Sequence, residues 1–154
     1  ALGAEVPLFP RSQAKAEEAR RQGADHVIVS TDAEQMRAAA GRFDFLLDTI
    51  PVQHDLNPYL ETLKFDGVHI LVGLIEPIDP AVHAAHLVTK RRVLAGSLIG
   101  GIAETQEVLD FCAEHNIRCD IEMLDIRNIN QAYERMIAGD VKYRFVIDMA
   151  TLQG

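Results

Sequence analysis

Short apolar segments alternate with segments of helical periodicity along almost the whole chain, and this alternation constrains the fold more than any other feature. The apolar segments, which predict buried strands, are 5–9, 26–29, 43–50, 68–72, 92–98, 120–124 and 142–148. The helical segments are 14–22, 31–40, 55–63, 79–89, 104–115 and 129–138. Strands joined by single helices form βαβ units, so we expect an α/β fold with a mostly parallel, doubly wound sheet covered by helices on both faces.

Residues with helix-capping side chains stand at the start of three helical segments. Ser12 can accept a hydrogen bond from an unpaired N–H of the first turn. Thr31 and Glu34 have the spacing of a capping box, in which hydroxyl and carboxylate each bind a backbone N–H. Asp79 followed by Pro80 suits a cap and the first helical position. We therefore predict that helices begin directly after Ser12, Thr31 and Asp79.

Charge and hydropathy exclude two classes of partner. The formal net charge is −8 over 154 residues, and an acidic surface of this kind repels nucleic-acid phosphates. No apolar run approaches the roughly 18 residues that span a bilayer, and the first residues do not resemble a signal peptide. Cys112 and Cys119 form no CxxC pair and no disulfide framework. We expect a cytoplasmic protein without nucleic-acid or membrane partners.

The first residues have the pattern of a helix end rather than of a domain start. Leu2-Gly3-Ala4-Glu5 and Gln22-Gly23-Ala24-Asp25 both read as a helix end that turns into a strand. A helix in a βαβ unit follows a strand and a turn, so we expect a truncated α/β domain. The pattern changes after Gly101, where we expect a domain boundary.

The end of the first apolar segment carries a candidate phosphate-binding group. In dinucleotide-binding folds an acidic residue after the second strand holds the ribose 2′-hydroxyl of NAD. This chain has Arg11, Ser12 and Lys15 there instead, at a helix N-terminus, which suits a 2′-phosphate. The alternative is an ordinary solvated helix start that Ser12 caps.

The turns after three further strands are candidates for a cofactor ring. Ligands of open α/β sheets bind beyond the carboxyl ends of the strands. These turns are mostly apolar and have free backbone groups: Thr49-Ile50, Val72-Gly73-Leu74 and Ser97-Leu98-Ile99. Plain loop geometry is the alternative. No G-x-G-x-x-G motif occurs in the chain, so a phosphate loop would lie upstream of Ala1.

Histidines and carboxylates give no metal or acid–base motif. His83 and His86 are three residues apart on a predicted helix, but no third ligand stands at metal-site spacing, which favours surface histidines. Asp44 and Asp48 are four apart on a predicted strand and could share one face. We favour a structural role for both carboxylates over an acid pair.

The chain closely resembles the cinnamyl alcohol dehydrogenase group of zinc-dependent alcohol dehydrogenases, in the medium-chain dehydrogenase/reductase superfamily. The resemblance rests on AGSLIGG at 95–101, INQAYERM at 129–136 and DVKYRFVID at 140–148. It extends to 1–6, 22–25, 63–67, 104–107, 109–115 and 120–122. It therefore covers nearly the whole chain.

The resemblance implies a fold and a cofactor. Residues 1–101 would form a truncated Rossmann-like dinucleotide-binding domain without its first strand and glycine loop, and 102–154 would return to the catalytic domain. The family prefers NADP, and the positions that match Ser12 and Lys15 contact its 2′-phosphate. Pro10 and Arg11 depart from the small hydroxyl residues usual there. The family's nicotinamide contacts come from the three turns named above, and Arg144 matches an arginine near the pyrophosphate.

The resemblance also implies an activity and its limits. Family members interconvert primary alcohols and aldehydes by hydride transfer, but their zinc ligands lie upstream of the position that matches Ala1. We therefore expect a C-terminal portion of an NADP-dependent zinc alcohol dehydrogenase, inactive by itself, that binds no metal. Homodimers are expected because relatives dimerise and because unpaired sheet edges favour association. The alternative is a naturally short, non-catalytic α/β nucleotide-binding or dimerisation module.

Overall fold

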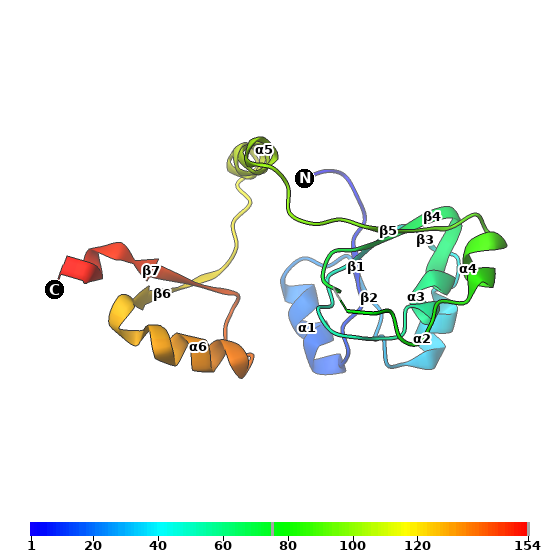
Figure 1. Ribbon diagram of the computed structural model, residues 1–154, viewed down its shortest axis with the longest axis horizontal. Helices are drawn as coiled ribbons and strands as arrows, with labels where there is room; N and C mark the ends of the chain where they lie inside the picture. Colours follow the sequence, from blue (N-terminus) through cyan, green and yellow to red (C-terminus); the bar gives the residue numbers. More distant parts are fainter. Residues whose placement is uncertain (75, 154) are drawn as a thin grey trace. The chain divides into compact units, whose positions relative to one another are not determined.

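The computed structural model describes residues 1–74 and 76–153 and divides into two compact units, Ala1–Ile99 and Gly100–Gly154. Strands and helices alternate through both units (Figure 1). The first unit contains β1 (Pro7–Leu8), α1 (Gln13–Arg21), β2 (His26–Val27), α2 (Ala33–Ala38), β3 (Phe43–Asp48), α3 (Asn57–Thr62), β4 (Leu63–Leu71), α4 (Ala84–Val88) and β5 (Val93–Gly96). The second contains α5 (Ile102–Glu114), β6 (Ile121–Asp125), the 3-10 turn η1 (Ile126–Asn128), α6 (Ile129–Ile137), β7 (Arg144–Asp148) and the 3-10 turn η2 (Met149–Gln153).

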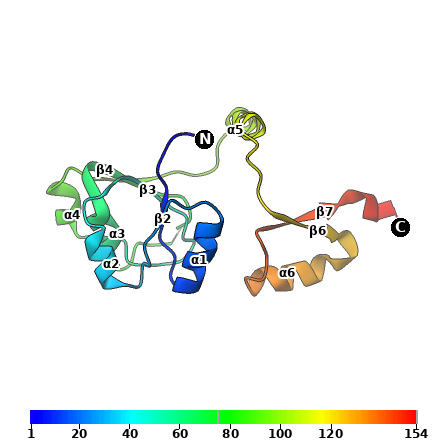
Figure 2. The ribbon, with the colours of Figure 1, turned by 180° about the vertical axis from the view of Figure 1, so that it is seen from behind.

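All strand pairs in the described residues are parallel, which confirms the predicted α/β class. β1 pairs with β2, β3 pairs with β4, and β4 pairs with β5. In the second unit β6 pairs with β7, and α6 connects them. No backbone ladder joins β1 to β3 within the described part, so the first unit has two hydrogen-bonded sheets. Figure 2 shows β3 and β4 of the first unit from behind.

The core of the first unit consists of two clusters that share aromatic neighbours. One cluster is Ile28, Met36 and Ala39, and the other is Leu46, Leu60 and Leu63. Three half-buried aromatic residues pack against both clusters, namely Phe9, Phe43 and Tyr59. The ring of Phe9 meets those of Phe43 and Tyr59 edge-on, with centroids 5.5 and 5.7 Å apart. Side-chain packing therefore connects the two sheets where backbone hydrogen bonds do not.

The predicted caps have mixed outcomes. Ser12 is the N-cap of α1, as predicted, and accepts a hydrogen bond from the N–H of Lys15. The capping box of Thr31 is wrong, because Asp32 caps α2. The Asp32 carboxylate accepts from the N–H groups of Glu34 and Gln35, at 2.9 and 3.1 Å. The Thr31 hydroxyl instead donates to the carbonyl of Arg11, 3.0 Å away, and so connects the ends of two strands.

The predicted helix start after Asp79 is also wrong, because α4 begins at Ala84. The side chain of Asn57 explains the delay. Its amide nitrogen donates to the carbonyl of Ala81, at 3.2 Å, and its oxygen accepts from the N–H of His83, at 2.9 Å. These contacts hold the segment before α4 outside helical geometry, since a helix would use the same backbone groups internally.

In the second unit, ion pairs join the sheet to the loop after α6. Arg135 of α6 binds Glu122 of β6 at 2.8 Å and Asp140 at 3.0 Å. Its guanidinium also lies over the ring of Phe145, 4.8 Å from the centroid.

None of the helices in residues 1–74 and 76–153 has both the length and the apolar character that a membrane-spanning helix needs.

Candidate functional site

Three turns that the sequence singled out lie side by side at the carboxyl edge of the three-stranded sheet. Thr49 follows β3, Val72 follows β4 and Ser97 follows β5, and these three strands are adjacent and parallel. Hydrogen bonds connect the turns. The N–H of Val72 donates to the carbonyl of Asp48 at 2.9 Å, and that of Ser97 donates to Leu71 at 3.0 Å. The site is therefore a continuous edge of backbone.

Gly73 is the closest point between the first two turns. A Cβ at this residue would lie 2.5 Å from the carbonyl oxygen of Thr49 and 2.8 Å from that of Ile50. Real Cβ atoms do not approach backbone so closely, so only glycine allows this contact. The glycine thus sets how near the turn after β4 lies to the turn after β3.

The outer surface of these turns is apolar and open. Leu98 and Ile99 are 78% and 90% exposed, while Ile50 and Leu74 are half-buried. Exposed apolar groups beside open backbone suit a flat aromatic ligand, which would cover them and bond to the backbone at its rim.

A buried carboxylate organises the turn after β3. The Asp48 side chain accepts hydrogen bonds from the N–H of Ile50 at 3.0 Å, from Nε2 of His54 at 2.9 Å and from Nε2 of His69 at 3.1 Å. Burial alone would raise the pKa of Asp48, but the bonds from His69, Ile50 and His54 outweigh it, so the pKa lies below its ordinary value of 3.8. Asp48 is therefore ionised at neutral pH.

The two histidines around Asp48 differ in their hydrogen bonds. Nδ1 of His54 lies 2.8 Å from the carbonyl of Val52, so both ring nitrogens of His54 face acceptors. His54 therefore lies between the carboxylate of Asp48 and a backbone carbonyl of its own loop. His69 is 1% exposed and its Nδ1 has no partner. The contact of its Nε2 with Asp48 is therefore the hydrogen bond that holds the His69 ring.

The sequence did not reveal this cluster. Asp44 and Asp48 do not form an acid pair, because Asp44 is exposed and binds Lys64 at 2.7 Å. The available signal was a carboxylate at the end of a mostly apolar strand, with His69 in the next strand and His54 in the loop between them. Buried charges need partners, and the two histidines supply them.

The predicted phosphate-binding residues lie together at the start of α1. The N–H of Lys15 donates to the Ser12 hydroxyl over a long distance of 3.4 Å. The side chains of Arg11 and Lys15 are exposed, and neither forms an ion pair within the described residues. The first turn of α1 holds no acidic residue. Two free cations thus flank the N-terminus of the helix.

Arg144 belongs to the second unit, and the described residues form no cluster of metal ligands. Arg144 is the first residue of β7 in the second unit. Throughout the part of the chain that the structure describes, no group of three or more His, Cys, Asp or Glu could hold a metal ion. The rings of His83 and His86 contact each other edge-on, with centroids 5.9 Å apart. Cys112 and Cys119 are free thiols.

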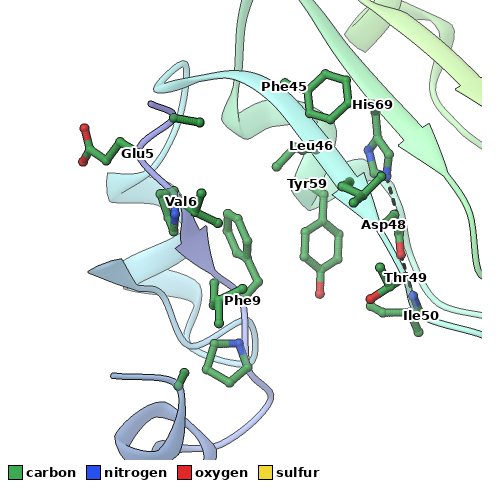
Figure 3. Close-up of a pocket in the computed structure, with 16 residues that line it drawn as sticks. Glu5, Val6, Phe9, Phe45, Leu46, Asp48, Thr49, Ile50, Tyr59 and His69 are labelled. Atoms are coloured by element: carbon green, nitrogen blue, oxygen red, sulfur yellow. Dashed lines mark hydrogen bonds and ion pairs between the residues drawn. The ribbon is translucent and has the colours of Figure 1, made fainter. Parts of the chain in front are cut away.

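A groove lies between β1 and β3 (Figure 3). Its volume is about 540 Å3, and residues 4–10 and 45–50 form its two walls, with Ala19, Tyr59 and His69 completing the lining. Phe9 and the turn Thr49–Ile50 lie toward the same end of the groove in Figure 3, and Pro10 also lines it. The groove therefore reaches from the residue before Arg11 to the carboxyl edge of β3.

Comparison with known proteins gives a consistent match. The zinc-binding dehydrogenase family model matches residues 1–114. Aldehyde reductase YahK of Escherichia coli is 51% identical over 99% of this chain and 44% of its own length. NADP-dependent alcohol dehydrogenase C 1 of Mycolicibacterium smegmatis is 47% identical, with the same coverage of 99% and 44%. The chain thus spans less than half the length of these curated relatives.

Solved structures of alcohol dehydrogenases also match this chain. A cinnamyl alcohol dehydrogenase of Sorghum bicolor superposes with a TM-score of 0.87 and 39% identity, over 96% of this chain and 42% of that one. The Helicobacter pylori enzyme complexed with NADP(H) gives a TM-score of 0.77 and 38% identity, over 97% and 42%. These matches extend the likeness from sequence to backbone arrangement.

Proposed function

The chain belongs to the zinc-binding dehydrogenase family, and from this premise we propose that it forms the NADP(H)-binding part of an enzyme that interconverts primary alcohols and aldehydes. In this proposal residues 1–101 form the truncated dinucleotide-binding domain, and residues 102–154 belong to the catalytic domain. The chain spans about 44% of its curated relatives, so the whole activity needs residues outside it.

The observation that carries the proposal is the contact of Gly73 with the turn after β3. A Cβ at Gly73 would lie 2.5 Å from the Thr49 oxygen, so these two turns lie against each other with no side chain of residue 73 between them. Open α/β sheets bind nucleotides at this edge. When bound, the nicotinamide would accept or deliver hydride. The chain's own part would be to orient the ring with its backbone and apolar side chains, namely Thr49, Ile50, Val72, Gly73, Leu74, Ser97, Leu98 and Ile99.

The start of α1 supports a preference for NADP(H) over NAD(H). Arg11 and Lys15 are exposed cations at a helix N-terminus with no acidic residue in the first turn. A phosphate is stabilised there by charge, by the hydroxyl of Ser12 and by the helix dipole. We assign the 2′-phosphate to Arg11, Ser12 and Lys15, and the pyrophosphate to Arg144.

The described residues do not fit the zinc of the family. They contain no group of three or more His, Cys, Asp or Glu that could hold it, so no step of the reaction is assigned to a metal on this chain. We propose that the chain by itself does not catalyse hydride transfer. We also propose a homodimer, which the open edge of β5 supports, since β5 pairs only with β4 in the described residues.

The direct test is cofactor binding. NADPH and NADH are titrated onto the full-length dehydrogenase that the proposal implies, and binding is followed by the fluorescence of the reduced nicotinamide. NADPH should bind at least about tenfold more tightly than NADH, since a charge-assisted contact contributes about 1.5–3 kcal/mol. Equal binding of the two cofactors would overturn the 2′-phosphate assignment.

A further inference from the structure

The loop that carries Arg11 is held by the end of the neighbouring strand. β1 and β2 pair in parallel, so their carboxyl ends lie side by side. Beyond the ladder, the N–H of Ser30 donates to the carbonyl of Pro10 at 2.9 Å, and the hydroxyl of Thr31 donates to the carbonyl of Arg11 at 3.0 Å. Hydrogen bonds between the two segments thus continue to the residue directly before the cap of α1.

A side chain makes the last of these contacts because the backbone ladder ends there. In a parallel pair, every second residue of one strand donates to its neighbour. The next donor after Ser30 would be Asp32 and the next acceptor would be Ser12. The N–H of Asp32 instead donates to the carbonyl of Val29 at 2.9 Å, and the carbonyl of Ser12 accepts from Ala16 inside α1 at 3.1 Å. The Thr31 hydroxyl therefore extends the contact by one residue past the last backbone bond.

The turn that carries Thr31 is itself fixed from both sides. Its closing hydrogen bond joins Asp32 to Val29, which is 8% exposed. Gln35 of α2 braces the same turn: its Oε1 accepts from the N–H of Val29 at 2.9 Å, and its Nε2 donates to the carboxylate of Asp32 at 2.8 Å. The hydroxyl of Thr31 is therefore presented by a rigid turn.

The contacts from Ser30 and Thr31 set the backbone at Arg11. Two peptide units flank the Cα of Arg11, and each is planar. The carbonyl of the first, from Pro10, is held by Ser30, and the carbonyl of the second, from Arg11 itself, is held by Thr31. Fixing both planes fixes the two backbone dihedral angles at Arg11. The direction in which its side chain leaves the backbone is therefore determined by the end of β2.

This direction matters because the guanidinium of Arg11 is exposed. A long exposed side chain loses conformational freedom when it binds a ligand, and ordering its backbone in advance reduces that loss. If the loop were mobile, Arg11 would face a bound phosphate in only a fraction of the molecules, and the apparent affinity would fall by that fraction. A residue that holds the loop can therefore increase affinity without contacting the ligand.

We propose that Thr31 is a positioning residue for cofactor specificity. Its hydroxyl holds the carbonyl of Arg11, directs the Arg11 side chain toward the 2′-phosphate of NADP(H), and so increases the preference for NADPH over NADH, which has no such phosphate. This inference rests on the proposed function, which assigns the 2′-phosphate to Arg11. Because the hydroxyl hydrogen is used by a backbone carbonyl, Thr31 acts through Arg11 and is not a direct phosphate ligand.

Thr31→Val tests the proposal in the full-length dehydrogenase. Valine has nearly the shape of threonine but no hydroxyl, and NADPH and NADH are titrated by the fluorescence of the reduced nicotinamide. We expect NADPH affinity to fall about threefold to tenfold, the effect of one hydrogen bond between uncharged groups, and NADH affinity to change less than about twofold. Thr31→Ser keeps the hydroxyl and should bind both cofactors within about twofold of the unsubstituted enzyme. An unchanged ratio of affinities in Thr31→Val, or an equal loss in Thr31→Ser, would overturn the proposal.

Thr89→Val is the matched control. The Thr89 hydroxyl also donates to a backbone carbonyl, that of Ala85 at 2.7 Å, and Thr89 is exposed at the end of α4. Its removal should leave the ratio of NADPH to NADH affinity unaltered, and a comparable fall would contradict the specific role of Thr31. The ratio stays informative if Thr31→Val is less stable, because both cofactors titrate the same folded molecules.

A double-mutant cycle with Arg11→Ala tests whether Thr31 acts through Arg11. Once the guanidinium is absent, Thr31→Val should cost less than about twofold in further NADPH affinity. Additive losses would show that Thr31 acts independently of Arg11 and would overturn the positioning role. The unsubstituted enzyme separates this inference from the proposed function. A clear NADPH preference that persists in Thr31→Val refutes the role of Thr31 alone, whereas equal binding of NADPH and NADH by the unsubstituted enzyme refutes the 2′-phosphate assignment and this inference with it.

Discussion

Gly73 lies against the carbonyl of Thr49 so closely that a Cβ at residue 73 would be 2.5 Å from the Thr49 oxygen. Two turns from successive strands thereby meet without a side chain between them. This close approach is possible because glycine has no Cβ. This relationship underlies the proposed nicotinamide site, and it leads to the first prediction.

Gly73→Ala should destabilise the chain by about 1–3 kcal/mol, because the methyl group must displace backbone rather than a flexible side chain. Cofactor affinity should fall as well, since the turns separate. Urea unfolding measures the first effect and NADPH fluorescence the second. Gly96→Ala is the matched control at the end of the next strand, where a Cβ would be an ordinary 3.9 Å from the nearest backbone oxygen. Similar losses in both variants would contradict the role given to Gly73.

The free energy of unfolding should decrease at low pH through Asp48. Its pKa is lower in the folded chain than the ordinary value of 3.8, so its stabilising effect is fully present above the unfolded pKa. It is lost as the pH falls through the folded pKa. Urea titrations from about pH 6 downward measure this change.

Asp48→Asn provides the control for that pH dependence. It should lower stability by about 1–3 kcal/mol at neutral pH, because His69 and His54 lose their shared acceptor charge. It should also show a shallower decline below about pH 4, since the other acidic groups remain. An unchanged decline in Asp48→Asn would show that Asp48 does not cause it.

Phe9→Ala should cost about 2–4 kcal/mol, although Phe9 is only half-buried, because its ring connects the two core clusters. We expect unit 1 to lose cooperativity as its two sheets separate, which denaturation followed by far-UV circular dichroism would detect. Phe65→Ala removes a ring that is 58% exposed and should have little effect. Comparable losses at both positions would refute the connecting role of Phe9.

Arg11→Glu should weaken NADPH binding by about tenfold to a hundredfold and leave NADH binding nearly unchanged, because the charge faces only the 2′-phosphate. Arg21→Glu makes the same change of charge in the last turn of α1 and should leave the ratio of the two affinities unaltered. Both are measured in the full-length dehydrogenase. An equal loss for NADH in Arg11→Glu would point to a structural effect instead.

Local patterns anticipated much of the fold. The strand predictions contain or overlap every observed strand, because apolar runs bounded by turn residues carry their own signal. Ser12 caps its helix as expected, since an N-cap needs only the next three residues. The failures at Thr31 and Asp79 arose from competing contacts. Asp32 stands one residue nearer the helix, and Asn57 holds the segment before α4 from a distant position in the sequence.

The candidate site likewise has one part that the sequence predicted and one part that it did not. The positions of the three turns follow from strand order, so the sequence was sufficient to name them. The cluster around Asp48 was not foreseen, because His69 comes from the next strand and the contact depends on the register between β3 and β4. Burial of a charge is a property of the packed state, and no residue spacing reports it.

By itself, the sequence determined the α/β class, the parallel direction of the strands and the turns at their carboxyl ends, because periodicity and capping act over a few residues. The tertiary structure alone decided which groups meet: Gly73 with Thr49, Asp48 with its two histidines, and Phe9 with Phe43 and Tyr59. These relationships depend on contacts between residues far apart in the chain, which packing and hydrogen bonding select only when the whole unit folds.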